Sequence, residues 1–195
     1  MINNDLINQI KSRRSVRKWK REKVPKELID KITDCGRRAP SSYGAEPWEL
    51  IVVDEEKTIE KLLSNRRQLK QPPYFINSSK YVDKSSKNKY GQVDPPPLMI
   101  IVAGDKKRCY DDLTGLIASL ACCTENMLLA SHALGLGACW LFVKDETMPE
   151  IEKEVKTVLG VPDGYVVLCL LAIGYPDEIP LKKTRKISKI HHNAW

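Results

Sequence analysis

The sequence lacks long apolar runs, and this shortage excludes a membrane-spanning protein at the outset. Its longest apolar stretches, residues 98–104 and 165–174, are shorter than the roughly 18 to 20 residues that cross a bilayer. The N-terminal segment MINNDLINQIKSRR has neither the apolar core nor the small-residue cleavage site of a secretory signal. We therefore expect a cytoplasmic protein with no membrane partner.

Closely spaced cysteine pairs and histidine pairs are also missing, which argues against metal chemistry. No two cysteines form CxxC, and His132, His191 and His192 make no HxxxH pattern and no zinc spacing with a cysteine. We predict no metal site. The cysteines lie in or beside apolar segments, so we expect buried free thiols and no disulfide framework; they are Cys35, Cys109, Cys122, Cys123, Cys139 and Cys169.

The charge is distributed unevenly along the 195 residues. Residues 11–23, 64–97 and 182–195 together carry +17, whereas the other 134 residues sum to −10 and the whole chain to +7. An acidic body with three basic segments differs from the broad basic surface of a nucleic-acid-binding protein, so we expect no nucleic-acid partner. The basic segments are either solvated loops or binding sites for an anion.

Helical and strand patterns alternate, which predicts a central sheet covered by helices on both faces. Continuous apolar runs at 48–54, 98–104 and 165–174 predict buried strands, and residues 137–142 predict a shorter one. Helices are expected near residues 5–12, 25–39, 55–63 and 145–160. We find no repeat and predict one domain over residues 1–195.

Two segments stand apart from this pattern. Residues 64–97 are polar, rich in lysine and serine, and end in three prolines; such a length predicts a variable loop or lid. Residues 113–134 form a helix that is apolar on nearly every side, so we expect it to be buried all round. Its small residues Gly115, Ala118, Ser119 and Ala121 would let a second subunit approach closely.

Several standard catalytic motifs are absent. The chain has no GxxxxGK[ST] phosphate loop, no GxSxG elbow and no paired carboxylates near a histidine. Gly135 and Gly137 begin a dinucleotide fingerprint, but Trp140 stands where the third glycine belongs and the segment follows a helix. Cys139 is either a packed thiol or a nucleophile without an identifiable base.

Two short patterns have the chemistry of an anion site and a ring site. In an extended chain Arg13, Ser15 and Arg17 point the same way and would present two guanidinium groups and a hydroxyl to one phosphate. Lys183 and Arg185 repeat the alternation near the C-terminus. The turn at residues 40–44 offers hydroxyls and backbone groups to a polar heterocycle, or simply ends a helix.

The order and spacing of five segments resemble the FMN-dependent nitroreductase family. They are RRSVRKW, RRAPSSYGAEPWELIVV, ENMLLASHALGLGACWL, VPDGYVVLCLLAIGYP and KKTRK, and the resemblance covers most of the chain except residues 64–97. It implies an α+β fold with a central mixed sheet flanked by helices. It also implies an intertwined homodimer in which the long helix packs at the interface and both subunits build each FMN site.

The resemblance assigns the cofactor contacts by position. The phosphate and ribityl end of FMN would be held by Arg13, Arg14, Ser15 and Arg17, together with Lys183 and Arg185. One side of the flavin ring would contact residues of the partner subunit, namely Pro40, Ser41, Ser42 and Gly44. The other side would lie along Ala138, Cys139, Trp140 and Leu141. Gly44 stands where the family commonly has Asn, and Glu46 where it has Gln. These departures bear on flavin potential and substrate choice.

The implied activity is a ping-pong transfer of hydride from NAD(P)H through FMN to a nitroaromatic, quinone or similar planar acceptor. Since the flavin carries the hydride, no catalytic side chain is needed. Tyr43, Trp140, Phe142 and residues 64–97 either shape the substrate face or, for the aromatics, pack in the core. Two alternatives stay open: a flavin-binding sensor or storage protein, and an enzyme of the same fold that catalyses dehalogenation or flavin breakdown.

Overall fold

The central sheet has four strands in the part of the chain that the structure, a computed structural model, describes: residues 5–68, 94–144, 149–180 and 190–195. The strands are β1 (Trp48–Val53), β2 (Leu98–Asp105), β3 (Gly137–Phe142) and β4 (Tyr165–Gly174), in the order β1-β2-β4-β3. β2 and β4 are central and buried on both faces, as their unbroken apolar runs predict.

The strand directions differ in one respect from the mixed sheet that was expected. All three strand pairings are antiparallel, and among the described residues a parallel pairing occurs only at the isolated bridge between Ser15 and Ala138. β2 and β3 run in the same direction, but β4 lies between them and runs the opposite way. Local patterns predict the strands but not this insertion.

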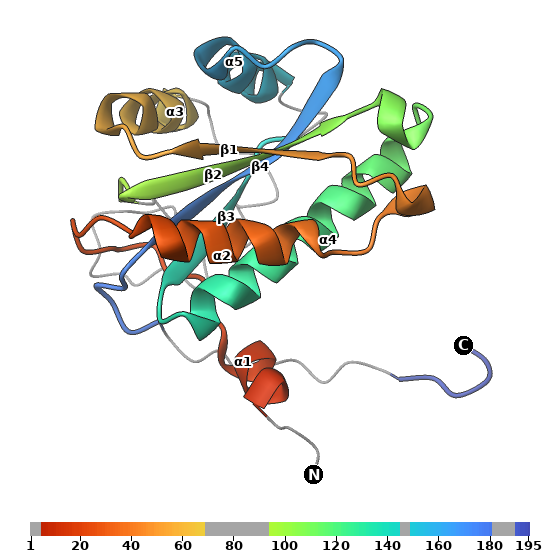
Figure 1. The fold of residues 1–195 in the computed structure, drawn as a ribbon, viewed down its shortest axis with the longest axis horizontal. Helices are drawn as coiled ribbons and strands as arrows, with labels where there is room; N and C mark the ends of the chain where they lie inside the picture. The colour runs from red at the N-terminus through yellow and green to blue at the C-terminus, as the bar shows by residue number, and fades with distance from the viewer. Residues whose placement is uncertain (1–4, 69–93, 145–148, 181–189) are drawn as a thin grey trace.

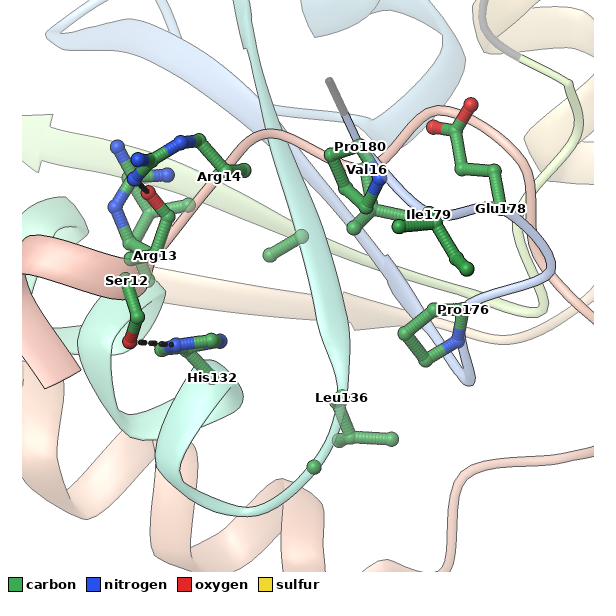
Figure 2. A pocket seen from close by; sticks show the side chains of 13 residues that line it. Ser12, Arg13, Arg14, Val16, His132, Leu136, Pro176, Glu178, Ile179 and Pro180 are labelled. Atoms are coloured by element: carbon green, nitrogen blue, oxygen red, sulfur yellow. Dashed lines mark hydrogen bonds between the residues drawn. The ribbon is translucent and has the colours of Figure 1, made fainter. Parts of the chain in front are cut away.

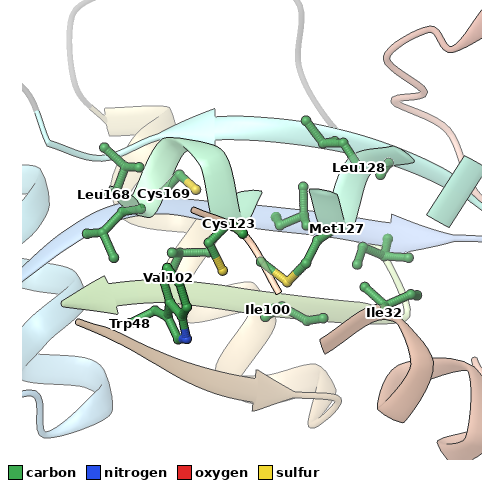
Figure 3. Packing of buried hydrophobic residues seen from close by; sticks show 14 of the residues in the cluster. Ile32, Trp48, Ile100, Val102, Cys123, Met127, Leu128, Leu168 and Cys169 are labelled. Atoms are coloured by element: carbon green, nitrogen blue, oxygen red, sulfur yellow. The ribbon is translucent and has the colours of Figure 1, made fainter. Parts of the chain in front are cut away.

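Helices cover both faces of the sheet, which confirms the predicted α+β class (Figure 1). α2 (Lys26–Arg37) and α4 (Leu113–Ala133) lie on one face, and α3 (Glu56–Gln68) and α5 (Pro149–Leu159) on the other. Alternate residues of β2 serve the two layers, since Ile100 packs with Met127 toward α4 (Figure 3) and Ile101 packs on the opposite side. The core therefore has two layers, one on each face of the sheet.

α4 is the core helix, although one side of it is open. The Asp112 side chain caps it by accepting hydrogen bonds from the N–H groups of Thr114 and Gly115, at 3.0 and 3.1 Å. It is the single described helix that is long and apolar enough to span a membrane, but it packs against the sheet and α2. The expectation that it is buried all round is wrong for the single chain, because Ala118, Cys122 and Ala133 are exposed.

The cysteines are only partly as predicted. Cys109, Cys123, Cys139 and Cys169 are buried, whereas Cys35 and Cys122 are exposed, and none of the six is in a disulfide. The two exposed thiols lie on the outer sides of α2 and α4, which apolar neighbours in sequence do not reveal. Burial raises the pKa of Cys123 to about 12, with a smaller contribution from Cys122, so its thiol stays protonated and unreactive.

The first residues of the polar segment predicted as a loop from residue 64 are helical in the structure. α3 continues through Gln68, so residues 64–68 are helical, and residues 69–93 lie outside the described residues. At the N-terminus α1 (Asp5–Ser12) is present as predicted, and its apolar side chains Leu6, Ile7 and Ile10 are all exposed in the single chain.

Candidate functional site

The site begins where the N-terminal basic segment lies against the edge of β3. The Val16 N–H donates to the Ala138 carbonyl at 3.1 Å, and the Trp19 indole N–H donates to the Gly137 carbonyl at 3.0 Å. A side chain at position 137 would collide with Val16, since a Cβ there would lie 2.6 Å from the Val16 Cβ. Glycine at 137 therefore permits the close approach that places the basic segment.

The other side of the same segment pairs with the chain that follows β4. Trp19 and Pro176 form an antiparallel bridge, the Lys20 N–H donates to the Tyr175 carbonyl at 2.9 Å, and the Asp177 N–H donates to the Lys18 carbonyl at 3.0 Å. Residues from near the two ends of the sequence are thus held side by side.

A cleft of about 370 Å³ opens at this junction (Figure 2). This volume is in the range of small-molecule sites. Its walls come from the N-terminal segment, the last turns of α4, the start of β3 and the chain after β4. The lining residues are Ser12, Arg13, Arg14, Val16, Leu128, His132, Gly135, Leu136, Ala138, Pro176, Glu178, Ile179 and Pro180.

Two guanidinium groups give the cleft its positive charge. Arg14 Nη1 donates to the carbonyls of Lys11 and Arg13 at 2.8 and 2.7 Å, which fixes that side chain and leaves its other donors available. Arg13 Nε lies 3.7 Å from a carboxylate oxygen of Glu125 on α4. These two arginines are preorganised for an anion.

His132 adds an imidazole to the same wall. Its Nε2 lies 2.8 Å from the Ser12 hydroxyl (Figure 2). Burial lowers the pKa of His132 below its ordinary 6.5, and the positive charges of Arg13 and Arg14 lower it further. The ring is therefore neutral at pH 7 before any anion binds.

The remaining predicted anion contacts are placed differently. Neither Ser15 nor Arg17 lines the cleft: Ser15 pairs with β3, and the Arg17 N–H donates to a Glu178 carboxylate oxygen at 2.5 Å while its side chain is exposed. That Arg13, Ser15 and Arg17 contact one phosphate stays a prediction. Lys183 and Arg185 lie outside the described residues.

The predicted ring contacts at residues 40–44 lie at the other end of α4. This turn contains the short helix η1 (Ser42–Gly44), and the Ser42 N–H donates to the Ser119 hydroxyl at 2.9 Å. A Cβ at Gly115 would come within 2.6 Å of the Ser42 hydroxyl oxygen. Ser119 and His132 are thirteen positions apart, about 20 Å along a helix. Within one chain, therefore, the arginines of the cleft lie far from Pro40, Ser41, Ser42 and Gly44.

The four predicted contacts on β3 divide between the two faces of the sheet. Ala138 lines the cleft, and Trp140 packs on the α4 side, whereas Cys139 and Leu141 belong to the cluster under α3 and α5. For Cys139 this placement favours the packed thiol over the nucleophile. The two candidates for the substrate face, Tyr43 and Phe142, are both exposed.

The family model described as the nitroreductase family matches residues 10–175. This span contains most of the chain, including the two arginines of the cleft and the 40–44 turn. The chain belongs to the nitroreductase family. The family and fold predicted from the sequence are thus confirmed, and this nitroreductase-family chain is an oxidoreductase.

Individual relatives of this nitroreductase-family chain are similar to it over nearly its whole length. A protein of Methanothermobacter thermautotrophicus named as an NADH dehydrogenase/NAD(P)H nitroreductase is 30% identical over 98% of this chain and 88% of its own length. A solved FMN-dependent nitroreductase from Clostridium difficile is 32% identical, with a TM-score of 0.73 and 97% and 99% of the two chains covered. An iodotyrosine deiodinase bound to FMN and 3-iodo-L-tyrosine, at 21% identity, TM-score 0.75 and coverage of 97% and 100%, shows the fold alone.

Two titratable residues of the cleft, His132 and Glu178, are not predicted from the sequence. The spacing of the histidines in the sequence is informative only about metal binding. A signal for His132 does exist, because it lies four positions after Leu128 and so on the same side of the helix. Both residues line the cleft. Glu178 has no sequence signal, because only the pairing of residues 18–20 with 175–177 brings it to the basic segment.

Proposed function

We propose that this chain, an NAD(P)H- and FMN-dependent oxidoreductase of the nitroreductase family, reduces nitroaromatics, quinones or similar planar acceptors in a ping-pong cycle. We further propose that it works as a homodimer in the cytoplasm. The observation that carries the proposal is the basic cleft between the N-terminal arginines and the chain after β4. When bound, FMN supplies the two-electron chemistry, so the protein has to bind, orient and shield.

The residues of the cleft fit the phosphate end of FMN. Arg13 and Arg14 provide fixed positive charge, and Ser12 and His132 provide a hydroxyl and a ring nitrogen. Guanidinium forks match phosphate oxygens well. Glu178 is the one acid among the described lining residues, and it is engaged by the Arg17 N–H. Arg14, whose side chain no described carboxylate engages, is the group that most favours an anion here.

Lys183 and Arg185 complete this proposal at the C-terminal side. Pro180 lines the cleft, and Lys183 and Arg185 follow it in the sequence; we propose both as further contacts to the phosphate. Two more cations near a phosphate would strengthen its binding and shield Glu178. We retain Ser15 and Arg17 as ribityl and phosphate contacts that would act beside Arg13 and Arg14.

The ring contacts are proposed to come from a second copy of the chain. Residues 40–44 lie about 20 Å along α4 from the cleft, and a twofold axis near the middle of α4 would bring this turn to the partner's cleft. The open side of α4 supports such an axis, since exposed Ala118 and Cys122 and half-buried Leu129 recur at helical spacing. The exposed apolar face of α1 adds surface for a partner.

No observation on this chain favours the alternative functions. The deiodinase likeness shows the fold alone, and a sensor without turnover would present the same binding residues. Steady NAD(P)H oxidation by the purified yellow protein with menadione or nitrofurazone would support the proposal. A flavin-loaded protein that is inert with both acceptors would favour the sensor.

The phosphate site is tested by replacing Arg13 with alanine. A charge-assisted hydrogen bond contributes on the order of 1.5 to 3 kcal/mol, so Arg13→Ala should raise the FMN dissociation constant about 10- to 150-fold. Titration of apoprotein by FMN fluorescence quenching measures it. Arg21→Ala is the matched control, because Arg21 is an exposed member of the same basic run outside the cleft. Unchanged binding in both Arg13→Ala and Arg14→Ala would mean that the phosphate lies elsewhere.

A further inference from the structure

Two exposed tyrosines form an aromatic pair beside the 40–44 turn. The rings of Tyr43 and Tyr110 meet edge to face, with centroids 5.6 Å apart and an interplanar angle of 90°. Tyr43 is 72% exposed and Tyr110 78% exposed, so most of each ring surface is open although the two rings touch. Aromatic surface that remains in water is available to a ligand.

Both tyrosines are held in a backbone conformation that side chains disfavour. Tyr43 has φ 57° and Tyr110 φ 52°, and Asp111 follows with φ 60°. Left-handed backbone crowds the Cβ of any residue except glycine, and for bulky residues it is rare. Such strain persists only where the surroundings impose it, and it is concentrated at sites that use the resulting geometry.

The surroundings do impose it, because the two turns are tied to α4 and to each other. The Ser42 hydrogen bond to Ser119 fixes one turn. The short helix η3 (Lys107–Cys109) fixes the other, with Cys109 fully buried. Arg108 joins the two, since its Nη1 donates to the Glu46 carbonyl at 3.0 Å and its Nη2 lies 3.8 Å from a carboxylate oxygen of Glu49. The ring pair is thus presented on a rigid support.

We propose that Tyr110, together with Tyr43, forms the aromatic wall that receives the planar electron acceptor, which makes Tyr110 a specificity-determining residue of this enzyme. The inference rests on the proposed function, in which the 40–44 turn contacts the flavin bound by the partner subunit. Tyr110 lies beside that turn and would therefore lie near the same flavin. A flat quinone or nitroaromatic stacks on a ring face, whereas a compact anion such as ferricyanide has no face to stack.

The test compares these two kinds of acceptor in Tyr110→Ala, Tyr110→Leu and Tyr110→Phe. Loss of one stacking contact should raise the menadione dissociation constant about 2- to 12-fold, measured by calorimetry on the flavin-loaded enzyme without NAD(P)H. The ratio of KM for menadione to KM for ferricyanide should rise by the same factor in Tyr110→Ala and Tyr110→Leu. Tyr110→Phe keeps the ring and should restore both values.

Wild-type menadione binding in Tyr110→Ala, or an equal rise of KM for menadione and ferricyanide, overturns the inference. If Tyr110→Ala does not fold, Tyr110→Leu, which keeps most of the side-chain volume, replaces it in both measurements. A wild-type chain that binds no FMN and oxidises no NAD(P)H overturns the proposed function and this inference with it. Normal wild-type turnover with unaffected Tyr110 variants overturns this inference alone.

Discussion

Glu152 shows how a single charged side chain is held in the layer between α5 and β4. One of its oxygens accepts the Val167 N–H at 3.1 Å, and Lys144 and Lys156 lie 3.1 and 3.4 Å from its carboxylate. Burial raises the pKa of Glu152, but the Val167 bond and the two lysines outweigh it, so the pKa lies below its ordinary 4.5. The carboxylate is therefore ionised in the folded protein at neutral pH and ties α5 to the sheet.

We predict that Glu152→Gln lowers the free energy of unfolding at pH 7 by about 2 kcal/mol, since it weakens hydrogen bonds to charged groups. The folded pKa is depressed, so the unfolded state binds the proton first as pH falls. The stabilisation is thus complete above about pH 4.5 and disappears as pH drops through the folded pKa. Urea unfolding at steps from pH 7 to pH 3 measures both effects.

Glu150→Gln is the control for this prediction, because Glu150 is exposed on the same helix. A Glu152→Gln deficit that persists unchanged at pH 3 would show that the charge is not its source.

At the scale of elements, the docking of the N-terminal segment on β3 positions the cleft. Gly137 lets Val16 approach β3, and the Trp19 indole closes the contact by bonding to the Gly137 carbonyl. Arg13 and Arg14 precede this contact in the chain and line the cleft. The geometry of the anion site therefore depends on packing a few residues away from it.

We predict that Gly137→Ala destabilises the protein by about 1 to 3 kcal/mol, because an added methyl overpacks a filled contact. It should also weaken FMN retention, since the displaced segment carries Arg13 and Arg14. Thermal unfolding and FMN titration measure the two effects. Gly164→Ala is the matched control, as nothing lies within 4 Å of a Cβ there. If Gly137→Ala binds FMN with wild-type affinity, the FMN site does not depend on this docking contact.

At the scale of the whole molecule, the proposed phosphate site and the proposed ring site lie far apart along α4. This distance is the reason for proposing a second subunit. The cleft lies at the C-terminal end of α4, and the aromatic pair and the 40–44 turn lie at its N-terminal half. Joining them across a twofold axis would bury the open side of α4 against itself. A monomer would leave that side and the apolar face of α1 in water.

We predict that the wild-type chain sediments at twice the 22.2 kDa chain mass and that Ala118→Glu shifts it toward the monomer with loss of FMN. The substitution places two carboxylates in a desolvated interface, where unpaired charge is costly. Sedimentation velocity and flavin absorbance check the result. Thr157→Glu, at an exposed position of α5, should stay dimeric and yellow. A wild-type protein that remains at the 22.2 kDa of one chain contradicts the proposed dimer.

The sequence by itself determined the elements of this protein and its family. β2 and β4 follow from unbroken apolar runs, and α4 from its long apolar pattern, because these signals act between near neighbours in the chain. Arg13 and Arg14 were predicted as anion contacts, and the structure places both in the cleft.

Only the tertiary structure decided which side chains meet. It inserts β4 between β2 and β3, leaves Arg17 out of the cleft lining, exposes Cys35 and Cys122, brings His132 and Glu178 to the cleft, and pairs Tyr43 with Tyr110. Each of these depends on contacts between residues tens to more than a hundred positions apart. Local spacing sets the direction of a side chain within its own element, but the packing of that element on distant ones sets what the side chain faces.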